Sequence, residues 1–143
     1  VLVVTEAFRA QKGAAAASSY RVSGTDITPV TGSAGNGRSE ICWAVTTPDG
    51  RFAFTTNFAD GAISRYAIAG DGSLTLEDSA AGLTEDGRPG LRDEGLSTDG
   101  RFLYAIDADS GSLFGWRVSD DGELSPVGDW AGLPATVAGL AAR

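Results

Sequence analysis

Short runs that alternate apolar with polar residues, separated by glycine-rich turns, make up most of this chain. Residues 62–68 (AISRYAI) and 112–118 (SLFGWRV) alternate in this way, which is typical of a strand with one buried face. Residues 51–57 and 101–107 are rich in aromatic side chains and are bounded by turn residues. No segment has the spacing of an amphipathic helix. The pattern therefore predicts an all-β protein.

The chain repeats itself with a constant offset of 50 positions. The recurring residues include Asp49-Gly50-Arg51-Phe52 with Asp99-Gly100-Arg101-Phe102, Gly61 with Gly111, Asp71-Gly72 with Asp121-Gly122, and Ala81-Gly82-Leu83 with Ala131-Gly132-Leu133. A period near 50 is that of a β-propeller blade. The turns between the runs contain Gly, which adopts positive φ at little steric cost.

Each repeat accommodates four strands, lettered A to D from the propeller's inner strand outward. We predict strand A at 41–47 and 91–97, B at 51–57 and 101–107, C at 62–68 and 112–118, and D at 73–78 and 123–128. The first group begins with B at 1–6, C at 18–22 and D at 26–31, and residues 139–142 are predicted to form a last strand A. We therefore expect one domain over 1–143, with repeat units of about 1–47, 48–97 and 98–143.

The predicted fold is a β-propeller arc of about three four-stranded antiparallel blades. Known propellers have roughly four to eight blades, so three blades leave sheet faces and strand edges open. Either the arc is part of a larger propeller, or self-association with a second copy completes it. The sequence leaves both alternatives open.

The amino-acid composition limits which binding partners and which kinds of catalytic site the chain can have. The net charge of −8 gives no electrostatic footprint for nucleic acid or for an anionic membrane surface, and no apolar run is long enough to span a membrane. The chain has no His and one Cys, which excludes Ser-His-Asp catalysis, thiolate metal clusters and an internal disulfide. We expect no cofactor and no metal. Cys42 is interpreted as a small apolar residue rather than a nucleophile, and the three Trp residues are expected to pack between blades: Trp43, Trp116 and Trp130.

Several segments resemble the lactonase-type seven-bladed β-propeller family, which includes bacterial 6-phosphogluconolactonases and fungal carboxymuconate cyclases. They are residues 42–45 (CWAV), 48–52 (PDGRF), 61–76, and the closing residues 132–134 and 138–141. The resemblance covers nearly the whole chain but only about the last three blades of such a protein. It implies hydrolysis of a small anionic sugar-acid lactone such as 6-phosphogluconolactone, at the mouth of the axial channel. The resemblance implies a site that uses His with Arg and Glu, and this chain has no His.

Strand direction sorts the connections onto two ends of the arc. The A–B and C–D turns share one end, here called the short-turn end, and four aspartates there are expected to bond to their own turns: Asp49, Asp71, Asp99 and Asp121. The B–C and D–A loops share the other, long-loop end. These loops differ between repeats, as functional loops on a repeated scaffold do.

The candidate site residues are polar groups at the long-loop end. As general bases that activate water, we predict Glu6, Glu40 and Glu94. As substrate-binding residues, we predict Arg38, Asn57, Arg88, Arg92 and Asp107, with the planar guanidinium groups binding phosphate or carboxylate. Two plainer interpretations stand beside this one. Arginines in glycine-rich loops need no function beyond solvation, and a charge buried at position 94 needs a partner. The alternative function is a non-catalytic module for ligand binding or self-assembly.

Overall fold

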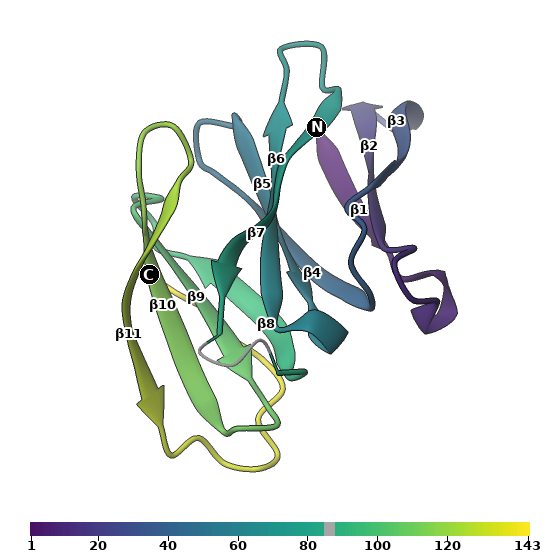
Figure 1. The fold of residues 1–143 in the computed structure, drawn as a ribbon. Helices are drawn as coiled ribbons and strands as arrows, with labels where there is room; N and C mark the ends of the chain where they lie inside the picture. The colour runs from purple at the N-terminus through teal and green to yellow at the C-terminus, as the bar shows by residue number, and fades with distance from the viewer. Residues whose placement is uncertain (85–87) are drawn as a thin grey trace.

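The computed structural model describes residues 1–84 and 88–143, which form three antiparallel sheets side by side (Figure 1). The first sheet contains β1 (Leu2–Glu6), β2 (Ala16–Ser23) and β3 (Asp26–Gly35). The second contains β4 (Ile41–Thr46), β5 (Phe52–Asn57), β6 (Ala62–Ile68) and β7 (Leu74–Leu83). The third contains β8 (Leu91–Leu96), β9 (Phe102–Asp107), β10 (Ser112–Val118) and β11 (Leu124–Ala131). Short 3₁₀ turns, η1 (Phe8–Ala10) and η2 (Phe58–Asp60), follow β1 and β5.

The prediction of an all-β propeller arc is confirmed. Within each sheet, consecutive strands are neighbours, so the order along the chain is also the order across the sheet. The second and third sheets have four strands each, and the first has three, at the positions of strands B, C and D. Residues 85–87, in the predicted connection 79–90, lie outside the described residues.

The outer strands are longer than predicted. Strand β7 continues to Leu83, whereas the alternating pattern ends at position 78. The pairing of β6 with β7 shifts register on both sides of Arg65, and the Asp78 carboxylate accepts a hydrogen bond from the N–H of Ala80 at 2.8 Å. A β-bulge resets the alternation without ending the ladder, so a period-two pattern stops too early.

The prediction of a last strand at 139–142 is wrong, although the segment lies beside the inner strand of the third sheet. The N–H of Leu140 donates to Asp93 Oδ2 on β8 at 2.6 Å. The backbone N of Ala142 is 3.3 Å from where a Cβ on Gly95 would stand. A strand needs a hydrogen-bonded partner, and none of the described residues pairs with this segment as a strand.

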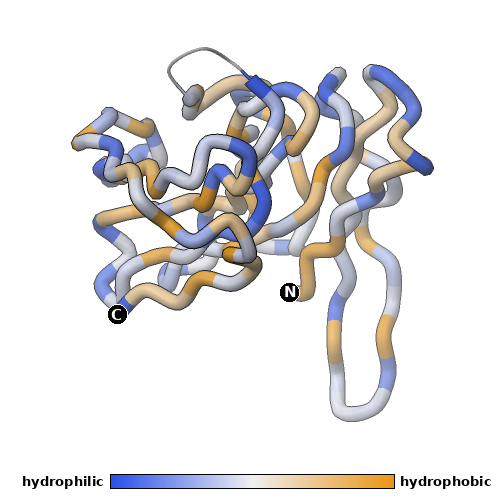
Figure 2. The backbone as a smooth tube through the Cα atoms, turned by 90° about the horizontal axis from the view of Figure 1, so that it is seen from below, coloured by the Kyte–Doolittle hydropathy of each residue, from blue (hydrophilic) through white to orange (hydrophobic). Residues whose placement is uncertain are grey.

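Two apolar layers join the sheets. The larger layer, between the second and third sheets, contains Phe54, Ile63, Leu91, Leu103 and Trp116, all essentially inaccessible to solvent. The smaller layer, between the first and second sheets, is built from Ala17, Ala53, Tyr66 and Leu74. Hydrophobic and hydrophilic residues are interspersed along the whole backbone (Figure 2). Successive side chains of a strand point to opposite faces of its sheet, so the middle sheet supplies side chains to both layers. The middle sheet is therefore covered on both faces.

The short-turn end is held by local hydrogen bonds. Asp49 Oδ1 accepts from the Thr47 hydroxyl at 2.6 Å and from the N–H of Arg51 at 3.1 Å. Asp99 Oδ1 accepts in the same way from Ser97 and Arg101, at 2.7 and 3.1 Å. The Thr47 hydroxyl above all lowers the pKa of Asp49 to about 2, and the Ser97 hydroxyl does the same for Asp99. The structural role predicted for these turn aspartates is confirmed.

Candidate functional site

Two threonines, Thr5 on β1 and Thr56 on β5, form hydrogen bonds that join neighbouring sheets at the inner edge of the arc. The Thr56 hydroxyl accepts from the N–H of Trp43 on β4 at 3.1 Å and donates to the carbonyl of Arg92 on β8 at 2.6 Å. In the preceding sheet, the Thr5 hydroxyl donates to the carbonyl of Cys42 at 2.8 Å. These bonds set the positions of β4 and β8, and with them the side chains that β4 and β8 carry at the long-loop end.

A cavity of about 290 Å³, here called the inner-edge cavity, lies between the starts of β4 and β8. Its lining consists of Cys42, Trp43, Phe58 and Arg92. Arg92 Cζ lies 5.3 Å from the centroid of the Phe58 ring, a cation–π distance that holds the guanidinium over an aromatic face. The cavity thus combines one cation with two aromatic rings.

Glu40 stands at the entrance to β4 in a left-handed backbone conformation, with φ of +54°. Its carbonyl accepts hydrogen bonds from the N–H of Phe58 at 2.9 Å and from the Cys42 thiol at 3.4 Å. Non-glycine residues rarely adopt this conformation, and such residues concentrate at functional positions. The strained turn brings Glu40 next to the inner-edge cavity.

The thiol of Cys42 is not set up as a nucleophile. Burial raises its pKa, the negative charge of Glu40 raises it further, and Arg92 opposes both with a smaller effect. A thiol must lose its proton to become nucleophilic. Arg92 lines the cavity and Glu40 lies beside it, and the charges of both influence the pKa of Cys42.

Glu94 is a different kind of group. It is 3% exposed, and neither side-chain oxygen has a hydrogen-bond partner among the described residues. Burial raises the pKa of Glu94 well above its usual value, and the neighbouring charge of Asp93 adds to the shift. It lines neither the inner-edge cavity nor the cavity described below. The raised pKa favours the protonated form of the carboxyl, and a protonated carboxyl cannot act as a general base.

Three further predicted residues are occupied by structural bonds. The Glu6 carboxylate accepts from the hydroxyls of Ser18 and Ser33. Asn57 is fully buried, and its Nδ2 donates to the carbonyl of Ala62 at 3.0 Å. Arg38 Nε donates to the carbonyl of Ser79 at 3.0 Å. None of these three residues lines the inner-edge cavity.

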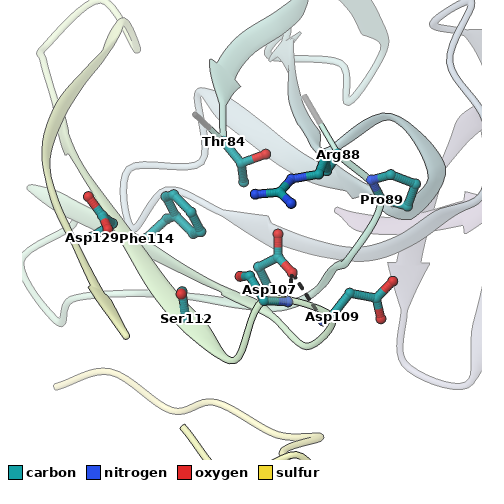
Figure 3. A pocket seen from close by; sticks show the side chains of 9 residues that line it. Thr84, Arg88, Pro89, Asp107, Asp109, Ser112, Phe114 and Asp129 are labelled. Atoms are coloured by element: carbon teal, nitrogen blue, oxygen red, sulfur yellow. Dashed lines mark hydrogen bonds between the residues drawn. The ribbon is translucent and has the colours of Figure 1, made fainter. Parts of the chain in front are cut away.

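A second cavity, of about 180 Å³, lies between the second and third sheets at the long-loop end (Figure 3). It is called here the inter-sheet cavity, and its lining includes Thr84, Arg88, Pro89, Asp107, Asp109, Ser110, Ser112, Phe114 and Asp129. Two of the predicted substrate-binding residues therefore meet here. The structure places Arg92 in the lining of the inner-edge cavity, with Glu40 beside it, and Arg88 with Asp107 in the lining of the inter-sheet cavity, so the predicted residues do not form one ring.

Sequence reasoning missed the aromatic residues of both cavities. The prediction that tryptophans pack between blades holds for Trp116, which is 1% exposed, and is wrong for Trp43 and Trp130, which are 42% and 49% exposed. One signal was available for the inner-edge cavity. Trp43 stands where the next repeat has Asp93, and Phe58 stands where it has Ala108, so both aromatics depart from the repeat.

Among residues 1–84 and 88–143, no group of three or more metal-binding side chains is arranged to hold a metal ion. In the same residues, no helix has both the length and the apolar character needed to cross a membrane.

The sequence profile described as "Lactonase, 7-bladed beta-propeller" matches residues 3–130. The chain belongs to this family. No curated protein matches the chain in sequence.

Solved structures agree on the fold of this lactonase-family chain. A functionally unknown protein from Desulfotomaculum acetoxidans matches 85% of the chain at 18% identity, with a TM-score of 0.67. A Bacteroides uniformis protein, provisionally described as a 6-phosphogluconolactonase, matches 83% at 22% identity, with a TM-score of 0.62. The periplasmic gluconolactonase of Pseudomonas aeruginosa matches 82% at 25% identity, with a TM-score of 0.59. The matched regions span 37%, 37% and 34% of those proteins, so the lactonase-family chain corresponds to about a third of each.

Proposed function

We propose that the inner-edge cavity is this chain's contribution to a site that hydrolyses an anionic sugar lactone, with 6-phosphogluconolactone as the substrate. One observation carries the proposal. Arg92 lines this cavity from β8, and Glu40, of opposite charge, stands just before β4 with its carbonyl hydrogen-bonded to the lining residues Phe58 and Cys42. Membership of the lactonase family and the two lactonase-described neighbours support the reaction class.

Each group has a chemical task in this proposal. The Arg92 guanidinium binds the anionic group of the substrate or stabilises the oxyanion that forms when water adds to the lactone carbonyl. The rings of Trp43 and Phe58 offer apolar faces to the C–H groups of the sugar. Glu40 accepts a proton from the attacking water. The bond between the carbonyl carbon and the ring oxygen then breaks, and the proton passes to that oxygen to give the open-chain acid.

Hydrolysis of 6-phosphogluconolactone by the purified chain, followed by acid release and corrected for the spontaneous rate, tests the proposal. Arg92→Ala is expected to lower kcat/KM by about 100-fold or more, and Glu40→Gln to lower kcat by about 100-fold. Arg117→Ala is the matched control, because Arg117 is an exposed β10 residue that lies over the Phe102 ring and does not line the cavity. Rates that are equal in all four proteins would refute the assignment.

A specific observation also favours the alternative function of assembly. Leu2, Val4, Val22 and Ile27 of the first sheet are between 39% and 60% exposed. Exposed apolar patches of this kind mark interaction surfaces. We infer that this sheet face packs against another sheet, supplied by a second copy of the chain. Light scattering that gives twice the chain mass, reverting to one chain mass in Val4→Glu, supports this inference. One chain mass at every concentration contradicts it and leaves the lactonase proposal standing.

A further inference from the structure

The inter-sheet cavity has a counterpart one repeat earlier, at the junction of the first and second sheets. Residues 50 positions apart occupy matching places in the two junctions: Asn57 and Asp107, Ser64 and Phe114, Ser79 and Asp129, Arg38 and Arg88. Only the arginine is the same in both. The chemistry of the two junctions therefore differs at the positions where the backbone repeat is retained.

In the first junction, the polar groups satisfy one another. Asn36 Nδ2 donates to Asn57 Oδ1 at 2.8 Å and to the Ser64 hydroxyl at 3.1 Å. The Ser64 hydroxyl donates to the carbonyl of Ser79 at 2.9 Å, and that carbonyl also accepts from Arg38 Nε at 3.0 Å. These short polar side chains form a closed network across the junction.

In the second junction, the matching side chains surround open space of about 180 Å³. Figure 3 shows Arg88 extending between Thr84 and Asp107, with Phe114 and Asp129 on the opposite side of the cavity. Asp107 is 3% exposed and Thr84 is also buried, whereas Arg88 and Asp129 are exposed. The cavity thus has a buried polar floor and a charged rim.

The floor is built to hold a carboxylate in place. Asp107 Oδ1 accepts from the N–H groups of Asp109 and Ser110 at 3.1 and 2.9 Å. A Cβ on Gly90 would overlap that same oxygen, so any other residue here would displace the Asp107 carboxylate. One repeat earlier, Glu40 occupies the matching position. The carboxylate of Asp107 and the glycine that admits it are both specific to the second junction.

The lining selects a class of ligand. Among the described residues, the lining contains three carboxylates, of Asp107, Asp109 and Asp129, and one guanidinium, of Arg88, and this acidic excess disfavours an anion. Carboxylates accept hydrogen bonds from hydroxyl groups, and Arg88 and the hydroxyls of Thr84, Ser110 and Ser112 can donate. The Phe114 ring offers a face for C–H groups. A cavity of roughly 150 Å³ is enough to hold a six-membered ring such as benzene.

We propose that the inter-sheet cavity binds a neutral, hydroxyl-rich six-membered ring, that is, a monosaccharide. It is separate from the inner-edge cavity, and none of the described residues lines both. The proposal therefore does not depend on the lactonase proposal. A ligand here contacts Thr84, which directly follows β7 of the second sheet, and residues of the third sheet such as Asp107 and Phe114, and so stabilises the junction of the two sheets.

Calorimetric titration of the 143-residue chain with D-glucose, D-galactose and myo-inositol tests the proposal. We expect saturable binding of at least one of these probes with one site per chain, and weaker binding of gluconate because of its charge. Asp129→Asn removes the rim charge at constant size and is expected to weaken binding by about tenfold or more. Phe114→Ser restores the residue of the first junction and is expected to abolish binding. Circular dichroism shows whether each variant is folded.

Arg92→Ala is the control, and it should retain sugar binding while it loses lactone hydrolysis. The two proposals can therefore fail separately. Absence of saturable binding for all three probes would overturn the monosaccharide site. So would binding that Asp129→Asn leaves unchanged, or tighter binding of gluconate than of glucose.

Discussion

Arg65 on β6 and Glu123, just before β11, form an ion pair with Nη1 and Oε1 2.6 Å apart, which joins the second sheet to the third. The Nε of the same guanidinium lies 3.1 Å from Glu77 Oε2, and its Cζ lies 5.9 Å from the Phe52 ring centroid. The Arg65 side chain is only 9% exposed, whereas that of Glu123 is 62% exposed. One nearly buried cation therefore contacts Glu77 and Phe52 of its own sheet and pairs with Glu123 across the junction.

This asymmetry predicts unequal effects of removing the two partners. Arg65→Ala removes the ion pairs and the packing on Phe52, and should lower the free energy of unfolding by about 2 kcal/mol. Glu123→Ala leaves Arg65 paired with Glu77 and should lower it by less than about 1 kcal/mol. Urea denaturation of both variants measures the difference. An equal or larger loss for Glu123→Ala would mean that Arg65 is not the central group of the junction.

Gly90 is predicted to be intolerant of any side chain. Its φ is +143°, and an added Cβ would overlap the Asp107 carboxylate. Gly90→Ala should therefore destabilise the chain by more than about 2 kcal/mol, since both backbone strain and a steric clash arise. Gly37→Ala is the matched control, because Gly37 has φ of +72° but open space around its Cβ position, and about 1 kcal/mol is expected. Thermal unfolding that ranks the two variants in the opposite order would contradict the packing described for Asp107.

Because the pKa of buried Glu94 is raised, we predict that the free energy of unfolding depends on pH. Its pKa is raised in the folded chain above the ordinary value of 4.5, so the folded chain retains a proton that the unfolded chain loses above that pH. Stability contributed by this group is therefore complete below pH 4.5 and is lost as the pH rises toward the folded-state pKa. Glu94→Gln, a neutral residue of the same size, should raise the denaturation midpoint at pH 7 and leave it nearly unchanged at pH 4.

Asp26→Asn, at an exposed carboxylate, is the control for Glu94→Gln and should show no such difference between the two pH values. A Glu94→Gln variant that is less stable than the parent chain at pH 7 would show that the carboxylate is ionised and paired there.

The fold could be predicted because its signals are local and repeated. Paired segments such as Asp49-Gly50 and Asp99-Gly100 give the blade period, and alternation within 62–68 and 112–118 gives the strands. The ends of the outer strands could not be predicted in the same way. The bulge at Arg65 depends on how two strands pair, and pairing is not visible in the pattern of either strand alone.

The candidate site was predictable only in part. The predicted strand directions put Arg88 and Asp107 at the same end of the arc, and the structure places both in the lining of one cavity there. Their separation from Arg92 depends on distance from the inner edge, which alternation does not encode. Glu94 is a buried carboxyl with no hydrogen-bond partner in the part of the chain that the structure describes, which runs against the expectation that buried carboxyl groups are paired. Only the packed structure shows this.

The central claim, that the inner-edge cavity receives an anionic sugar lactone, is tested most directly by the fluorescence of Trp43. Trp43 lines this cavity, whereas Trp116 is buried between sheets and Trp130 lies on β11. Titration with 6-phosphogluconate, the stable product of the reaction, should change the emission saturably. The change should vanish in Trp43→Phe, persist in Trp130→Phe and require higher concentrations in Arg92→Ala. A parent chain whose emission does not respond, or a response that survives in Trp43→Phe, would contradict the claim.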